Sequence, residues 1–246
     1  MNLSPISDPL SGLLEVIADP RRATLAASST AEWDEIKRTA HQHGLSGVLA
    51  QLCADCLPAD QKPWLREVMA TQLASHHRRL RELKTIADAL DAEGIRFVVL
   101  KGPVLGERYL HPPFLKVSGD LDLLMDEANL RLAGRCLTAA GWIEELRPSP
   151  WWMWRRRCHH IAFKPSPRLP AGASVELHYL LPWHRPPIGA TDLLDRSEWW
   201  TGADGLRVRV LEPADEAIFL AIHAARHFFS RLAWLCDAPW YFACCR

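Results

Sequence analysis

The sequence has no excess of either charge, because its 29 Lys and Arg residues match its 29 Asp and Glu residues. A general nucleic-acid binder normally carries a basic excess, so this balance argues against that class. Apolar runs of the roughly 18–20 residues that span a bilayer are missing, and the N-terminus lacks a basic stretch followed by an apolar one. We therefore expect a cytoplasmic protein with no membrane partner.

A disulfide framework is also missing. The seven cysteines are an odd number at irregular spacing in a chain of 246 residues, so reduced thiols are expected. The sequence shows no internal repeat and no low-complexity tract. With 48% hydrophobic and 24% charged residues, the composition is that of a globular protein with its own core, in one large domain or two small ones.

Hydrophobic periodicity divides the chain into three predicted parts, 1–91, 92–211 and 212–246. The first part is mostly helical and contains a long helix opened by Pro63. The middle part contains short strands, which we expect at 95–100, 120–125, 142–143, 160–163, 174–179 and 206–211. The segment 192–200 fits neither period. A helix begun by Pro213, with apolar positions through to Leu232, forms the last part.

Two carboxylates in the predicted strand 120–125 point to metal binding. Asp120 and Asp122 are separated by one residue, so in a strand they share a face at roughly 6.5–7 Å along the chain. Leu121 and Leu123 then point into the core. Neighbouring carboxylates repel each other, and a hard cation such as Mg²⁺ relieves that repulsion.

The segment before this strand points to phosphate binding. Gly102 follows an apolar strand and precedes a helix begun by Pro103, so its backbone is expected to approach an anion closely. Lys101 adds a positive charge. Each motif alone is common in turns and on exposed strand faces, but together they predict a phosphate site and a metal site in one pocket.

These residues resemble the uncharacterised nucleotidyltransferases of the DNA polymerase β-like superfamily. The family pattern runs from Leu-Lys-Gly, through a Tyr-Pro-rich segment with an Arg, to Asp-Ile-Asp-Leu-Leu-Val and a later Glu-Leu-His-Trp. The similar segments here are Leu100-Lys101-Gly102, Tyr109 to Pro112, Asp120 to Met125 and Glu176-Leu177-His178-Tyr179. Lys116 stands where the family pattern has arginine. With similarity around 33–45 and 223–237, the resemblance covers most of residues 30–237.

The resemblance implies an α+β fold: a polymerase β-like core with a small mixed sheet, flanked by N-terminal and C-terminal helical segments. It also implies transfer of a nucleoside monophosphate from an NTP, with ATP expected, to an acceptor hydroxyl with release of pyrophosphate. The acceptor would be a small molecule, a peptide or a protein.

Residue roles follow from the same resemblance. Asp120, Asp122 and Glu176 would be the catalytic carboxylates and the ligands of Mg²⁺, and Glu176 would also help to deprotonate the acceptor. Lys101, Gly102 and Lys116 would bind the nucleotide. For His178, which shares the strand face of Glu176, a place near the site and a structural hydrogen bond both stay open.

An alternative function is a catalytically inactive nucleotide-binding or protein-docking member of the same fold. It is motivated by Lys116 and by a chain that ends earlier than is usual in the family. A third hypothesis is a zinc scaffold built from Cys53, Cys56, His223 and His227, although we expect the two histidines to pack their helix against the core.

The cluster Trp151 to Arg157 has tryptophans next to arginines, which could stack a base and bind phosphates. A structural or protein-docking role is the favoured interpretation. The neighbouring His159 and His160 are predicted to be structural.

Overall fold

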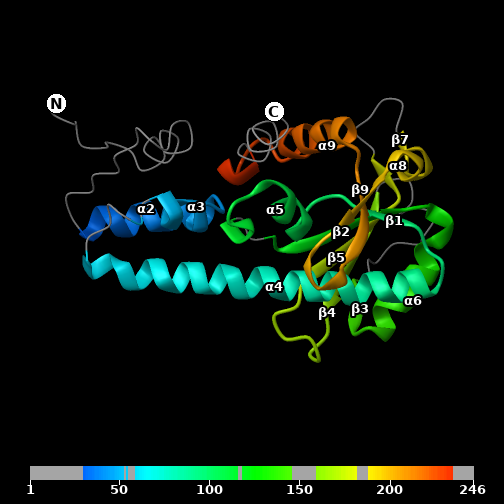
Figure 1. The fold of residues 1–246 in the computed structure, drawn as a ribbon, viewed down its shortest axis with the longest axis horizontal. Coiled ribbons are helices and arrows are strands. Elements are labelled where there is room, and N and C mark those ends of the chain that lie inside the picture. The colour runs from blue at the N-terminus through cyan, green and yellow to red at the C-terminus, as the bar shows by residue number, and fades with distance from the viewer. Residues whose placement is uncertain are drawn as a thin grey trace.

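A computed structural model describes residues 30–52, 54, 59–115, 118–145, 159–181 and 188–234. It confirms the α+β class, because helices pack on both faces of a seven-stranded mixed sheet (Figure 1). In this part of the chain, every helix is too short or too polar to cross a membrane.

The strands follow one another across the sheet in an order that differs from their order in the sequence. From edge to edge they are β3 (Trp142–Glu144), β4 (His160–Pro165), β5 (Ser174–His178), β2 (Asp120–Met125), β1 (Phe97–Val99), β9 (Arg207–Val210) and β8 (Glu198–Thr201). Strand β2 is parallel to β5 and β1 is parallel to β9, whereas the other neighbours are antiparallel. Strands β6 (Leu180–Leu181) and β7 (Ile188–Gly189) form a separate ribbon.

The helices predicted to open at Pro63 and Pro103 are both present. The α-helices are α2 (Thr30–Gln42), α3 (Ser46–Leu52), α4 (Lys62–Ala92), α5 (Pro103–Tyr109), α6 (Leu130–Ala139), α8 (Ala190–Arg196) and α9 (Pro213–Arg226). Short 3-10 turns occupy η1 (Ala59–Gln61), η2 (Pro113–Leu115), η3 (Glu127–Asn129) and η4 (Ala203–Gly205).

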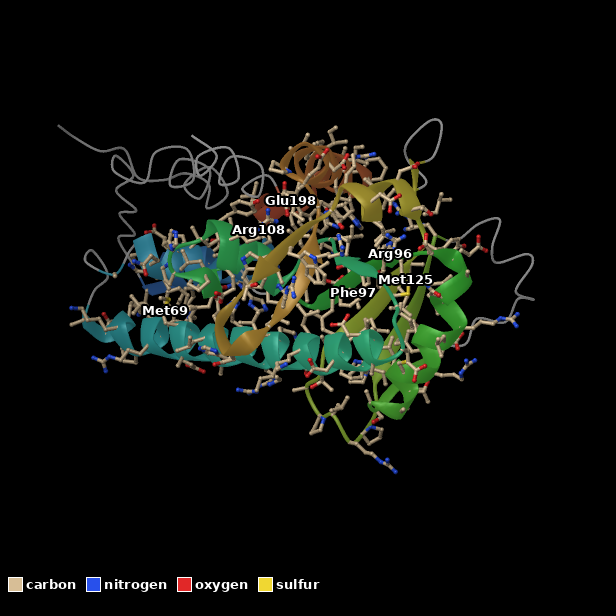
Figure 2. The ribbon with its side chains drawn as sticks, turned by 45° about the vertical axis from the view of Figure 1, so that its right-hand side comes forward. Met69, Arg96, Phe97, Arg108, Met125 and Glu198 are labelled. Atoms are coloured by element: carbon tan, nitrogen blue, oxygen red, sulfur yellow. The ribbon has the colours of Figure 1, made fainter. Side chains whose placement is uncertain are left out.

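Helix α4 covers one face of the sheet with its C-terminal half. Leu83, Ile86 and Leu90 recur at helical spacing, are fully buried, and pack in one core with strand residues and α6. The N-terminal half of α4 continues beyond the sheet and packs beside α2 and α3, as Figure 1 shows in cyan and blue. In Figure 2, Met69 marks that half of α4, away from the sheet. The helix ends at the predicted boundary near residue 92, and the division into three domains stays a prediction.

Helices α8 and α9 cover the opposite face. Because strand side chains alternate, Val98 and Leu124 face this second layer, where they pack with residues of α8 and α9. Phe97 and Met125, which pair across β1 and β2 and lie side by side in Figure 2, belong to the α4 side. The sheet therefore lies between two apolar layers.

Helix α9 is shorter than the sequence pattern predicts. It ends at Arg226 instead of reaching Leu232, because Phe228 and Phe229 adopt positive φ angles of 52° and 51° and break the helical path. Leu232 packs instead in the cluster formed by α2 and α3. The turn after α9 thus returns the chain toward the N-terminal helices.

Candidate active site

The three carboxylates predicted from the sequence lie on one face of two neighbouring strands. In the parallel register of β2 and β5, Asp122 pairs with Glu176 and Asp120 pairs with Ser174. All of these side chains share the face of Leu124, which is the face covered by α8 and α9. The side chain of Asp122 is only 3% exposed, whereas Asp120 is 35% and Glu176 is 29% exposed. Asp122 is therefore the buried member of the set.

Lys101 follows β1 and places its ammonium group between the two aspartates. The Nζ atom lies 3.4 Å from Asp120 Oδ2 and 3.2 Å from Asp122 Oδ2. Burial opposes the charged form, but the attraction of Asp122 and Asp120 raises the pKa of Lys101 above its usual value. Lys101 is therefore a permanent cation at neutral pH.

His178 lies between the carboxylates of Asp122 and Glu176. Its Nε2 atom lies 3.1 Å from Asp122 Oδ1 and 3.2 Å from Glu176 Oε2. His160, paired with His178 across β4 and β5, has its Nε2 3.8 Å from Glu176 Oε1. His178 therefore lies beside two of the predicted site carboxylates and also makes a hydrogen bond to Asp122.

The charges of the carboxylates follow from these partners. Burial tends to raise the pKa of Asp122, but Lys101 and His178 hold it well below its usual range. Burial also opposes ionisation of Glu176, yet the hydrogen bond from His178 lowers its pKa. For Asp120, burial and the repulsion of Asp122 raise the pKa. Asp122 and Glu176 are thus the more firmly ionised pair.

Gly102 has a backbone conformation that the sequence motif requires. Its φ of 97° and ψ of −145° lie in a region that is almost restricted to glycine, and Pro103 then starts α5. Ser118 Oγ donates a hydrogen bond to the main-chain oxygen of Asp120 at 2.6 Å, which fixes the facing loop. This loop lies next to Gly102, because a Cβ added there would be 3.5 Å from both Asp120 O and Ser118 Oγ.

A cavity of about 410 Å³ opens over these residues. Its lining includes charged and polar residues, which we call the charged wall, namely Lys101, Gly102, Ser118, Gly119, Asp120, Ser174 and Glu176. The other lining residues come from α5, α9 and the turn after α9, namely Leu105, Gly106, Tyr109, Leu110, His223, His227, Arg231 and Trp234. The cavity therefore combines charged groups with several rings.

A buried carboxylate fixes α9 against α5. Glu216 is 2% exposed, and its two carboxylate oxygens accept hydrogen bonds from Arg108 Nη1 and from the Tyr109 hydroxyl, both at 2.5 Å. Arg108, labelled in Figure 2, also lies over the ring of Tyr109. Tyr109 lines the cavity, so this clamp holds α9 against a helix that contributes to the cavity lining.

The donor set fits a divalent cation. Asp122, Glu176 and His178 each present one ligand atom, all within 4.8 Å of one another. Among the described residues, Asp122 Oδ2 accepts no well-aligned hydrogen bond, although Lys101 Nζ is close to it. A buried, ionised oxygen with a free lone pair suits a hard metal ion. His159, His160 and His178 form a second group of the same spacing.

Other predicted residues have different outcomes. Lys116, Cys53, Cys56 and the cluster 151–157 lie outside the described residues. His223 is buried and packs against Phe219, as expected for a helix-packing residue.

The contribution of His223 and His227 to the pocket wall was not predicted. Neither histidine belongs to a metal-competent group in the described part of the chain. The only sequence signal was their spacing of four on a helix that also carries the apolar face.

The comparisons with known proteins agree with the motif analysis. A family model described as an uncharacterised nucleotidyltransferase matches residues 29–244, which is most of the chain and includes every residue of the pocket. No curated protein matches the chain.

Proposed function

Because the chain belongs to this uncharacterised nucleotidyltransferase family, we propose that it transfers a nucleoside monophosphate from an NTP to an acceptor hydroxyl and releases pyrophosphate. The observation that carries the proposal is the convergence of Lys101, Asp120 and Glu176 on one pocket, with Asp122 buried directly behind them. The same proposal includes a polymerase β-like arrangement of the core.

Mg²⁺ is the proposed cofactor, held by Asp120, Asp122 and Glu176. Oxygen ligands are those that Mg²⁺ prefers, and two of the three carboxylates are held ionised by their neighbours. When bound, the ion would neutralise phosphate charge and polarise the phosphoryl oxygens.

The protein's own groups would position the reactants. Lys101 offers a charge to the triphosphate, and Gly102 leaves room for its close approach. Glu176 lines the cavity as a carboxylate and can accept the proton of the acceptor hydroxyl. His178 Nε2, 3.2 Å away, holds Glu176 in place and stabilises its charge. ATP is the expected nucleotide, and a small molecule, peptide or protein is the expected acceptor.

Label transfer tests this function. The full chain is incubated with Mg²⁺, α-labelled ATP and acceptor fractions, and both covalent label and pyrophosphate are measured. We expect the two to appear in equal amounts in at least one fraction and to vanish when EDTA removes Mg²⁺. Label that stays in free nucleotide, with no pyrophosphate in any fraction, would contradict the proposal.

One observation favours the inactive nucleotide-binding member as a second candidate. Lys101 and His178 already neutralise much of the carboxylate charge without a metal. Calorimetry separates the candidates: binding of MgATP without pyrophosphate release, across all acceptor fractions, would favour the inactive form.

A further inference from the structure

The lining of the cavity that contains Lys101 also contains an array of rings. His223 lies in the last turn of α9 and His227 directly follows the helix, with ring centroids 4.8 Å apart. Trp234 returns to the same place after the turn, 4.6 Å from the ring of His227 at an interplanar angle of 38° and 5.5 Å from His223 at 86°. We call His223, His227 and Trp234 the aromatic wall.

Packing alone does not account for the outer part of this wall. His223 is buried, but His227 is exposed and Trp234 is only half-buried, and all three line the cavity. Because both rings line the cavity, the uncovered parts of His227 and Trp234 border its open space. The faces of His227 and Trp234 are thus partly available to a ligand.

Arg231 adds a cation beside the rings. Its guanidinium lies 5.7 Å from the centroid of Trp234, and it lines the same cavity. Within the residues that the structure describes, the exposed side chain of Arg231 makes no hydrogen bond or ion pair. It differs in this from Lys101, whose charge is shared with two aspartates.

The aromatic wall lies within electrostatic reach of the charged wall. Burial and the charges of Lys101 and Arg226 lower the pKa of His227, while Asp120 and Glu176 act in the opposite direction. The imidazole is therefore neutral at neutral pH and offers an uncharged planar surface. A ligand in this cavity meets both charged groups and rings.

We propose that His227 and Trp234 form a stacking platform for the base of the bound nucleotide, with Arg231 beside it. The inference rests on the proposed function, because a nucleoside triphosphate is the ligand class that combines a polyanionic end with a planar aromatic end. Stacking recognises the flat face that every base has, so it discriminates little between bases by their ring substituents. Purines, which cover more ring area than pyrimidines, are therefore the favoured substrates.

Calorimetry in Mg²⁺ with two probes tests the platform. MgATP has both a base and phosphates, whereas inorganic tripolyphosphate has phosphates only. We expect Trp234→Ala to weaken ATP binding by about 5- to 150-fold, the range of base–aromatic stacking, and to leave tripolyphosphate binding unchanged. Trp234→Phe keeps a ring and should retain most of the ATP affinity.

Two further variants provide a control and a second test of the platform. Trp199→Ala removes an exposed tryptophan from β8, outside the cavity, and should leave both affinities unchanged. His227→Ala changes an exposed ring, so it serves as a second platform variant if Trp234→Ala does not fold.

The outcomes separate the platform from the proposed function. Equal affinity of the wild type for ATP and tripolyphosphate would overturn the platform while leaving phosphate and metal binding intact. A parallel loss of both probes in Trp234→Ala and His227→Ala would also overturn it, because the wall would then shape the pocket without contacting the base. Binding of neither probe by the wild type would refute the proposed function, and the platform with it.

Discussion

Among single residues, Lys101 has the largest effect on the charge balance of the site, because it pairs with two aspartates. A lysine beside two aspartates compensates a repulsion that would otherwise destabilise the end of β2. Asp122, almost fully buried, depends on this compensation, whereas Asp120 is partly exposed and is repelled by Asp122. Removing the charge of Asp120 should therefore cost little stability. A loss of activity in an Asp120 variant can then be attributed to catalysis more directly than a loss in an Asp122 variant.

Gly102→Ala should destabilise the protein by about 1–3 kcal/mol, the cost of a side chain in a backbone region reserved for glycine. An added Cβ would meet its nearest atoms at 3.5 Å, which is ordinary contact, so the cost comes from the backbone. Chemical denaturation measures it. Gly119→Ala is the matched control, because a Cβ there meets nothing within 4 Å and no positive φ is involved, and its change should be under about 0.5 kcal/mol. Equal losses in both variants would refute this account of Gly102.

The clamp between α5 and α9 is the critical contact at the scale of secondary-structure elements. Glu216 extends from α9 and accepts hydrogen bonds from two consecutive residues of α5, so the helix that carries His223 is joined to the helix that follows Lys101 and Gly102. Burial raises the pKa of Glu216 even with Arg108 beside it. Removing the cation that pairs with a buried carboxylate strongly destabilises the folded protein.

Arg108→Met should lower the free energy of unfolding by about 3–5 kcal/mol, because it leaves the buried Glu216 carboxylate without its cation. The pH dependence has a defined sign. A carboxyl whose folded pKa lies above its unfolded value destabilises the fold as it ionises, so the deficit should grow as pH rises from about 4.5.

Denaturation of Arg108→Met at several pH values gives this measurement. Lys84→Met is the control, because Lys84 pairs with Asp88 on the surface and should contribute less than about 1 kcal/mol. A deficit in Arg108→Met that does not change with pH would contradict the role assigned to Glu216.

At the scale of the whole molecule, elements governed by local pattern could be predicted. Strand β2 has the predicted bounds, because two aspartates on one face and leucines on the other leave only one register against the core. Helix α4 was predicted because Pro63 opens it and Gly94, at a φ of 68°, follows its end. The segment 192–200 stayed ambiguous because it contains the end of α8 and the edge strand β8, whose side chains are largely exposed.

The site could be predicted only where local sequence motifs encode it. Asp120 and Asp122 share a short motif, and Glu176 was found through the family pattern. The contact of His178 with Asp122 depends on the pairing of β2 with β5, which no local pattern encodes, whereas its contact with Glu176 follows from their spacing of two on β5. The aromatic wall depends on the turn at Phe228 and Phe229, which returns Trp234 to His227. Positive φ at two consecutive phenylalanines results from tertiary structure and cannot be predicted from their residue type.

The central claim, that the β2 carboxylates drive nucleotidyl transfer, is tested most directly by Asp120→Asn. The measurement is pyrophosphate release with MgATP and a responsive acceptor fraction, together with the thermal midpoint. We expect Asp120→Asn to lower the rate at least about 100-fold, since several kcal/mol of charge stabilisation is lost, while the midpoint stays close to wild type. Asp195→Asn, which removes an exposed partner of Arg96, should retain full activity. Full activity in both Asp120→Asn and Asp122→Asn would contradict the claim.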